Sequence, residues 1–205
     1  MENQVKSKER TAKFGEVYTA SREVNAMIDL IGEDAGSLSS RILEPACGDG
    51  NFLDELLRRK LKTAAETEGS WEIHSLQALS VLYGIDILMD NVLASRNRLK
   101  DIWLNAWRER GQEPDEAVSA FADRLLERNI VCGDFLSERK VDENQNPLDQ
   151  PIEFTGWTFT GGSKVETETV LLSDMSCPEG CSSICDFFEQ EDAPVDVLDY
   201  RRQPS

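Results

Sequence analysis

Residues 41–53 read RILEPACGDGNFL, and this stretch decides the fold that we expect. Residues 41–44 are apolar enough to form a short strand. The turn PACGDG follows, and Asn51 then opens an amphipathic helix. Small residues at 46, 48 and 50 let a ligand approach the backbone closely, and the start of the helix offers backbone N–H groups. A tight strand-to-helix turn without a ligand would have the same pattern.

Two further strands are predicted, and each ends in an acidic residue. Residues 81–86 (VLYGID) end on Asp86, and residues 129–134 (NIVCGD) end on Asp134. Strands that alternate with helices are typical of an α/β fold with a parallel sheet. Ligands of such sheets bind beyond the carboxyl ends of the strands.

Helical patterns occupy four segments between and before these strands. Ser21 is expected to cap the first helix, and Gly32 to end it. Residues 63–71 are expected to form a loop or the frayed end of a helix, while 75–82 are apolar without a clear period. The four predicted helices cover about residues 21–31, 51–62, 89–108 and 114–128.

The charge of the chain is acidic and uneven. The 205 residues carry a net charge of −17, and residues 137–205 hold 15 Asp and Glu against five Lys and Arg. Such a balance repels nucleic acid at long range, and a free-standing DNA-binding module is usually basic. The last segment is also turn-rich, with weak strand patterns. We therefore expect 137–205 to be an acidic, poorly structured or incomplete extension.

The composition also bears on location. No apolar run approaches the roughly 18 residues that a membrane helix needs, and the polar start of the chain has no secretory signal. We expect a cytoplasmic protein with reduced thiols.

Cys177, Cys181 and Cys185 are spaced more widely than most zinc ligands, so we predict free thiols and no metal site.

Side chains at the ends of the second and third predicted strands are of types that could contact a ligand. Asp86 could accept hydrogen bonds from ribose hydroxyls, although it follows Gly48 by 38 residues and the usual gap is about 20. Asp134 could bind an adenine amino group, with Phe135 stacked on the ring. The alternatives are a solvated strand-end acid for Asp86, and a turn that returns Phe135 to the core.

Taken together, four segments resemble the adenine-N6 DNA methyltransferases of restriction–modification systems. The segment FGEVYT (14–19) is similar to the FGEVFTP of that family, and EPACGDGNF (44–52) to its first cofactor motif. YGIDI and NIVCGDFL are similar to the second and third motifs. The resemblance covers about residues 13–136. By itself, the first segment would indicate only a hydrophobic staple before a helix.

The resemblance implies a Rossmann-like S-adenosylmethionine-dependent methyltransferase fold, incomplete in this chain. Residues 1–13 would be a flexible basic arm and 14–136 the cofactor-binding domain. Ala20 replaces the proline of the family motif, which would loosen the entry to the first helix. By this resemblance, the cofactor would be closed over by Phe14, Tyr18 and Thr19, and its methionine part would be lined by Glu44, Ala46, Gly48 and Gly50. Asp86 would bind the ribose, and Ile87 would lie against the adenine. The edge and face of the adenine would be bound by Asp134 and Phe135.

No Asn-Pro-Pro-Tyr/Phe catalytic motif is found, so no catalytic residue is assigned. Asn146-Pro147-Leu148-Asp149 lacks the second proline and the aromatic residue, and we interpret it as a turn. The strand-like VDVLD (195–199) should instead lead into the motif, but YRRQPS follows. Codons for YRRQPS exist that read Ile-Gly-Gly-Asn-Pro-Pro after a one-base shift. We hypothesise a frameshift near Leu198–Tyr200 in a longer methyltransferase gene.

The expected function is therefore that of a DNA adenine-N6 methyltransferase component in truncated or split form, with S-adenosylmethionine as cofactor. The alternative is a non-catalytic S-adenosylmethionine-binding module or regulatory subunit that needs a partner chain. Expected partners are a complementary methyltransferase fragment or a specificity or nuclease subunit. We expect DNA binding only in a complete enzyme, weak or none by this chain alone, and no membrane partner.

Overall fold

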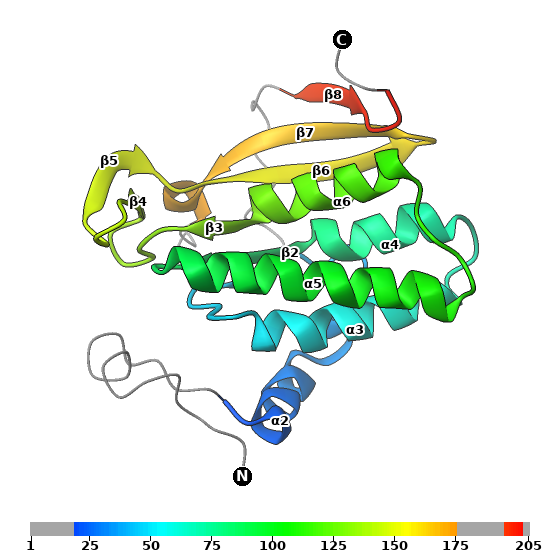
Figure 1. Cartoon of the computed structure of the whole chain (residues 1–205), viewed down its shortest axis with the longest axis horizontal. Coiled ribbons are helices and arrows are strands. Elements are labelled where there is room, and N and C mark those ends of the chain that lie inside the picture. The colour runs from blue at the N-terminus through cyan, green and yellow to red at the C-terminus, as the bar shows by residue number, and fades with distance from the viewer. Residues whose placement is uncertain (1–18, 176–194, 203–205) are drawn as a thin grey trace.

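The computed structural model describes residues 19–175 and 195–202, which form a mixed α/β structure (Figure 1). A three-stranded parallel sheet in the order β1-β2-β3 lies at its centre. The elements are α2 (Ser21–Ile31), η1 (Gly32–Ala35), β1 (Ile42–Glu44), α3 (Asn51–Glu66), α4 (Trp71–Ser80), β2 (Leu82–Asp86), α5 (Met89–Glu109), α6 (Glu116–Asn129), β3 (Ile130–Cys132), β4 (Arg139–Val141), β5 (Pro147–Pro151), β6 (Glu153–Gly161), β7 (Lys164–Leu171), η2 (Leu172–Met175) and β8 (Asp196–Asp199).

The three predicted strands form and pair in parallel, which confirms the α/β class. Ile42 of β1 lies opposite Leu82 of β2, and Gly84 of β2 lies opposite Ile130 of β3. Because all three strands point the same way, their carboxyl ends meet at one edge of the sheet. Helices α3 and α4 connect β1 to β2, and helices α5 and α6 connect β2 to β3.

The long interval between the glycine turn and Asp86 contains a second helix. The loop or helix end predicted at 63–71 consists of the last turn of α3, which continues to Glu66, and a short loop before α4, which begins at Trp71. Ser70 caps α4, since its side-chain oxygen accepts a hydrogen bond from the Ile73 N–H. The additional helix α4 therefore accounts for the 38 residues that separate Gly48 from Asp86.

The first helix begins one residue earlier than expected. Ala20, not Ser21, is its N-cap, and the Ala20 carbonyl accepts hydrogen bonds from Glu23 and Val24 N–H. Ala20 has φ −64°, which is close to the value that proline would impose. The helix therefore starts normally without the proline of the family motif. Gly32 follows the helix with φ 71°, as expected for its end.

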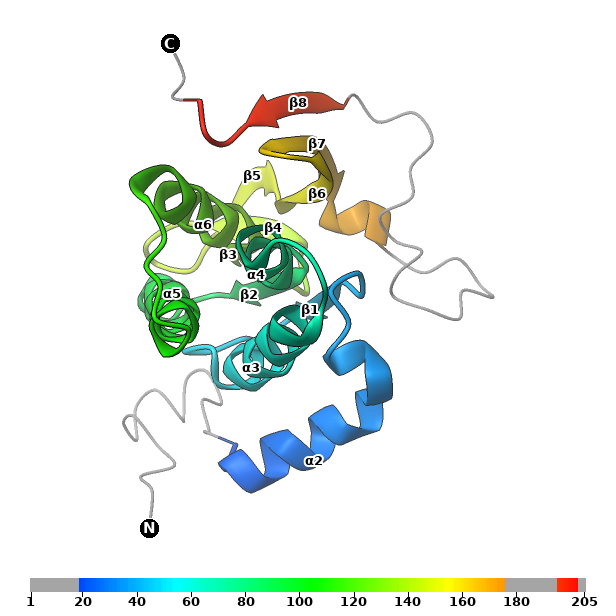
Figure 2. The ribbon, with the colours of Figure 1, turned by 90° about the vertical axis from the view of Figure 1, so that its right-hand side faces the viewer.

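Alternate residues of the sheet face two different layers. Gly84 points toward α3, since a Cβ atom at this position would lie 3.0 Å from the Leu53 Cδ1. Tyr83 points the other way, where its ring lies edge-on to Phe154 at 5.4 Å and its hydroxyl donates to the Thr155 carbonyl. Figure 2 shows α3 and α5 on the side of the sheet away from β6 and β7. The start of the hairpin thus covers one face of the sheet, and α3 and α5 cover the other, while α4 and α6 also contact β6.

The extension after residue 137 is more ordered than its composition suggested. Strands β6 and β7 form a long antiparallel hairpin, and a smaller pair, β4–β5, precedes it. The expected poor order is therefore wrong for the described part of 137–205. The alternation of apolar residues is weak because the hairpin packs through a few large side chains, which form a second core with the sheet: Tyr83, Ile85, Ile152, Phe154, Val170 and Leu172.

Strand β8 forms where the sequence predicted a strand, but it joins a different sheet. It pairs antiparallel with β7, and Val165 lies opposite Leu198. The parallel sheet consists, among the described residues, of β1, β2 and β3, so β8 is not one of its strands.

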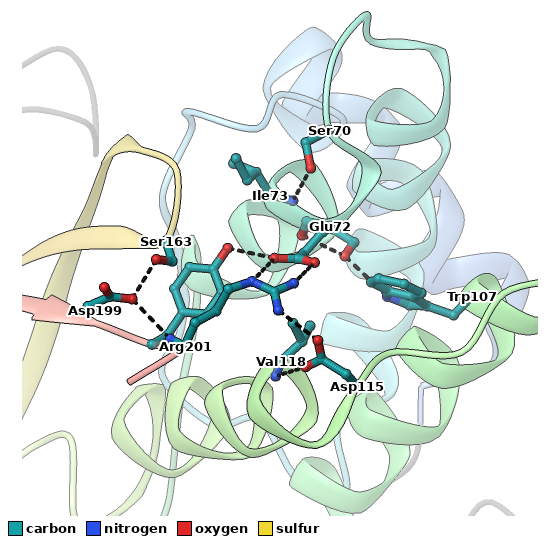
Figure 3. Close-up of polar contacts among 11 residues, drawn as sticks. Ser70, Glu72, Ile73, Trp107, Asp115, Val118, Ser163, Asp199 and Arg201 are labelled. Carbon is teal, nitrogen blue, oxygen red and sulfur yellow. Dashed lines mark hydrogen bonds and ion pairs between the residues drawn. The ribbon is translucent and has the colours of Figure 1, made fainter. Parts of the chain in front are cut away.

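The two residues after β8 attach the strand to the helices (Figure 3). The Tyr200 ring stacks on Phe121 at 4.8 Å, and its hydroxyl donates to Glu72 over 2.9 Å. The Arg201 guanidinium bonds to Glu72 and lies 2.7 Å from Asp115. These contacts join β8 to α4 and to the start of α6.

A buried lysine holds the loop that leads into β1. Lys60 of α3 is 0% exposed, and its ammonium donates to the backbone carbonyls of Asp34, Ser37 and Ser40. Burying an ammonium is costly unless its donors are satisfied. Three carbonyls satisfy all three N–H groups, so Lys60 fixes the path of this loop on α3.

Some expectations fall on parts of the chain that are not described. The basic arm 1–13, Phe14, Tyr18 and the cysteines at 177, 181 and 185 lie outside the described residues. Within the described part, no helix is long and apolar enough to cross a membrane.

Candidate functional site

A cavity of about 660 Å³ lies at the carboxyl ends of the parallel strands. Its walls come from the start of α2, the turn after β1, the first residues of α3, the β2–α5 junction and the turn after β3. The residues that line it are Thr19, Val24, Met27, Glu44, Pro45, Ala46, Cys47, Gly48, Asp49, Asn51, Phe52, Asp86, Ile87, Leu88, Asn91, Gly133, Asp134, Phe135 and Leu136. Eight of the eleven predicted site residues thus line one cavity.

Asp86 connects the elements around this cavity. One carboxylate oxygen accepts a hydrogen bond from the Gly48 N–H at 3.0 Å, and the other from the Leu88 N–H at 2.8 Å. The amide of Asn91 donates to the same oxygen as Leu88, at 3.2 Å. Asp86 is therefore not merely a solvated strand-end acid, because it orders the glycine turn and the start of α5 at the cavity wall.

The glycine turn depends on two residues with left-handed backbone conformations. Gly48 has φ 54° and Gly50 has φ 88°. A Cβ atom on Gly48 would meet no atom within 4 Å, whereas one on Gly50 would lie 2.6 Å from the Ser95 Oγ and 3.1 Å from the Ser95 Cα. Gly50 does not line the cavity. Its role is to let α5 pack closely against the start of α3.

We expect Gly50→Ala to destabilise the fold by about 2–4 kcal/mol, because backbone strain adds to overpacking against Ser95. Gly111→Ala is the matched control. Gly111 also has a left-handed φ, 68°, but a Cβ there would meet nothing within 4 Å. We expect it to cost only about 1 kcal/mol. Urea unfolding of both variants measures the difference, and equal losses would contradict the proposed clash.

The turn after β3 places an acid and an aromatic ring at the cavity. Asp134 accepts hydrogen bonds from the N–H groups of Leu136 and Ser137, so its carboxylate also shapes its own turn. Phe135 is 40% exposed and lines the cavity. It therefore does not return to the core, which was the alternative interpretation of this segment.

The segment before α2 is tied to the first helix after the glycine turn. The side-chain amide of Asn51 donates to the Thr19 carbonyl over 2.8 Å. Thr19 itself lines the cavity. Because this hydrogen bond joins residues 32 positions apart, it fixes where the chain enters α2, directly beside the turn.

Acidic side chains line the cavity. Its described lining holds four carboxylates, from Glu44, Asp49, Asp86 and Asp134, and no Lys, Arg or His. Asp49 is paired with Arg98 at 2.9 Å. Burial raises the pKa of Glu44, although a hydrogen bond from the Ala46 N–H partly opposes this. A cavity of this kind favours a cationic ligand over an anionic one.

Both cysteines at this edge of the sheet remain neutral thiols. Burial, followed by the nearby charges of Asp86 and Glu44, raises the pKa of Cys47 strongly. Burial and the charge of Asp86 also raise the pKa of Cys132. A nucleophilic cysteine needs a lowered pKa. These thiols therefore act as packing groups and not as nucleophiles.

The structure adds residues that the sequence did not single out. Asn91 is 1% exposed and reaches the cavity from the first turn of α5. The sequence pattern around Asn91 gave no signal for this position. The string at 146–149 was predicted to be a turn, but Pro147, Leu148 and Asp149 belong to strand β5. Asn146 lies directly before this strand, where its backbone N–H and side-chain amide donate to Asp142.

Comparisons with protein-family models, with curated proteins and with solved structures gave no match.

Proposed function

We propose that the chain binds S-adenosylmethionine in the cavity at the ends of β1, β2 and β3, within a Rossmann-like methyltransferase fold. It would be the cofactor-binding component of a DNA adenine-N6 methyltransferase. The strand order β1-β2-β3 agrees with one half of a classic doubly wound sheet. The motif resemblance in 13–136 supports the family, and the geometry of the cavity supports the ligand.

The charge of the cavity is the observation that carries this proposal. Common nucleotide cofactors such as NAD and ATP carry negatively charged phosphates, which the carboxylates of Glu44, Asp86 and Asp134 would repel. S-adenosylmethionine carries a positive sulfonium and a positive ammonium group instead. Of the common adenosine-containing ligands, it is the one whose charge complements this cavity.

The described residues suit the parts of this ligand. Asp86 would accept hydrogen bonds from the ribose hydroxyls, with Ile87 against the adenine. Glu44, Ala46 and Gly48 would surround the methionine part, whose carboxylate suits the N-terminal end of α3. Asp134 and Phe135 would bind the adenine edge and face. When bound, S-adenosylmethionine supplies an electrophilic methyl group.

Methyl transfer to adenine needs a second part. The target base must leave the duplex and enter a pocket, where acceptor groups and a stacking ring position its amino group. Asn146 is directed to Asp142, and the described residues offer no other Asn-Pro string. We therefore propose that a partner chain supplies the catalytic loop and most of the DNA contacts, and that this chain alone is a cofactor-binding module.

Thermal unfolding with different ligands tests this proposal. S-adenosylmethionine and S-adenosylhomocysteine should raise the melting temperature of the chain by several degrees, since a ligand at 100 times its Kd adds about 2.7 kcal/mol. NAD and ATP at the same concentrations should have no effect, because the cavity disfavours phosphates. Stabilisation by NAD or ATP but not by S-adenosylmethionine would overturn the assignment.

A further inference from the structure

The buried side-chain amide of Asn91 lies next to the carboxylate of Asp86, which we propose binds the ribose. Asn91 is in the first turn of α5, and 1% of its surface is exposed. Its side-chain nitrogen donates to the Asp86 Oδ1 at 3.2 Å, and the residue also lines the cavity. The same carboxylate also accepts hydrogen bonds from the backbone N–H groups of Gly48 and Leu88.

Asn91 is one of two buried polar residues of α5. Its buried neighbours Val92, Leu99 and Trp103 are apolar, and Ser95, one turn further along, is the other polar residue. A buried amide is costly unless its hydrogen bonds are made. The bond to Asp86 provides such compensation, and it also restricts rotation of the carboxylate.

We propose that Asn91 is a positioning residue that holds the Asp86 carboxylate in the orientation that accepts both ribose hydroxyls, and that it thereby determines selectivity for ligands with an intact ribose diol. This inference rests on the proposed function. Asn91 acts through Asp86, and no contact of Asn91 with the ligand is required. The backbone N–H groups of Gly48 and Leu88 each bond to a different oxygen of the carboxylate, and Asn91 adds a second donor to the oxygen that Leu88 bonds, which reinforces this orientation.

A comparison of two ligands separates this role from a purely structural one. S-adenosylhomocysteine and its 2′,3′-dideoxy analogue are titrated by calorimetry into the whole chain, unmodified and as Asn91→Ala and Asn91→Ser. The unmodified chain should prefer the diol by about 100-fold, for two hydrogen bonds to a carboxylate. In Asn91→Ala, the ratio of the affinities for the two ligands should fall by a factor of about ten. Asn91→Ser should restore part of this ratio.

Ser95→Ala is the matched control. Ser95 lies one turn further along α5 and is 0% exposed, and its side chain packs against Gly50. Its removal should leave the diol preference unchanged. An Asn91→Ala variant that keeps the full preference, or that loses affinity for both ligands equally, overturns the inference. Failure of the unmodified chain to bind either ligand overturns the proposed function instead.

Discussion

Asp86→Ala is expected to lower the affinity for S-adenosylmethionine by at least about 100-fold. The proposed site loses the acceptor of both ribose hydroxyls, and each hydrogen bond to a charged group contributes about 1.5–3 kcal/mol. The same carboxylate accepts hydrogen bonds from the Gly48 and Leu88 N–H groups, so the glycine turn also loses its side-chain hydrogen bond to β2, while the bond from the Cys47 N–H to the Ile85 carbonyl remains. Calorimetric titration of the variant with S-adenosylmethionine measures the loss of affinity.

The structural part of this effect has to be separated from the loss of ligand contacts. A melting curve of Asp86→Ala without ligand gives the cost to the fold, which we expect to be about 1–3 kcal/mol for donors left without an acceptor. Asp101→Asn is the charge control, because it removes one negative charge from an exposed position of α5. It should bind as the unmodified chain does. Full affinity in Asp86→Ala would show that the ribose does not lie at this carboxylate.

Lys60→Met is expected to destabilise the chain by about 3 kcal/mol or more. The substitution preserves much of the side-chain volume but leaves the carbonyls of Asp34, Ser37 and Ser40 without their donor. Each unsatisfied buried group costs about 1–3 kcal/mol, less where water can reach it. For a chain of this size the melting temperature should fall by about 6–12 °C.

Lys62→Met provides the control for this change. Lys62 lies two residues further along α3 and is exposed. The same substitution there should change the stability by no more than about 0.5 kcal/mol. A comparably small loss for Lys60→Met would mean that the ammonium does not hold the loop before β1.

The central part of the fold could be predicted from the sequence because its signals are local. Residues 41–53 contain strand, turn and helix in sequence, and the acids at 86 and 134 mark the ends of the other strands. Parallel pairing then brings these ends together, which places eight predicted residues around one cavity. The preference of Gly48 and Gly50 for left-handed conformations is likewise a property of the residues themselves.

The parts that could not be predicted depend on contacts between distant residues. The β6–β7 hairpin is ordered by Phe154 and Trp157, which pack on Tyr83 and Phe121 from earlier in the chain. Asn91 lies in an ordinary helical pattern, and only the folded structure brings it to Asp86. The strand 196–199 was predicted as a strand, but its partner β7 is set by tertiary packing and not by its own residues.

Calorimetric titration of the unmodified chain with S-adenosylmethionine tests whether the cavity at the ends of β1, β2 and β3 binds this ligand. We expect saturable binding at one site per chain, because one cavity combines the glycine turn, Asp86 and the turn at Asp134. A chain that melts cooperatively and yet releases or absorbs no heat of binding at several temperatures, up to millimolar ligand, would contradict it. The motifs that resemble those of the methyltransferases would then not form a cofactor-binding site in this chain.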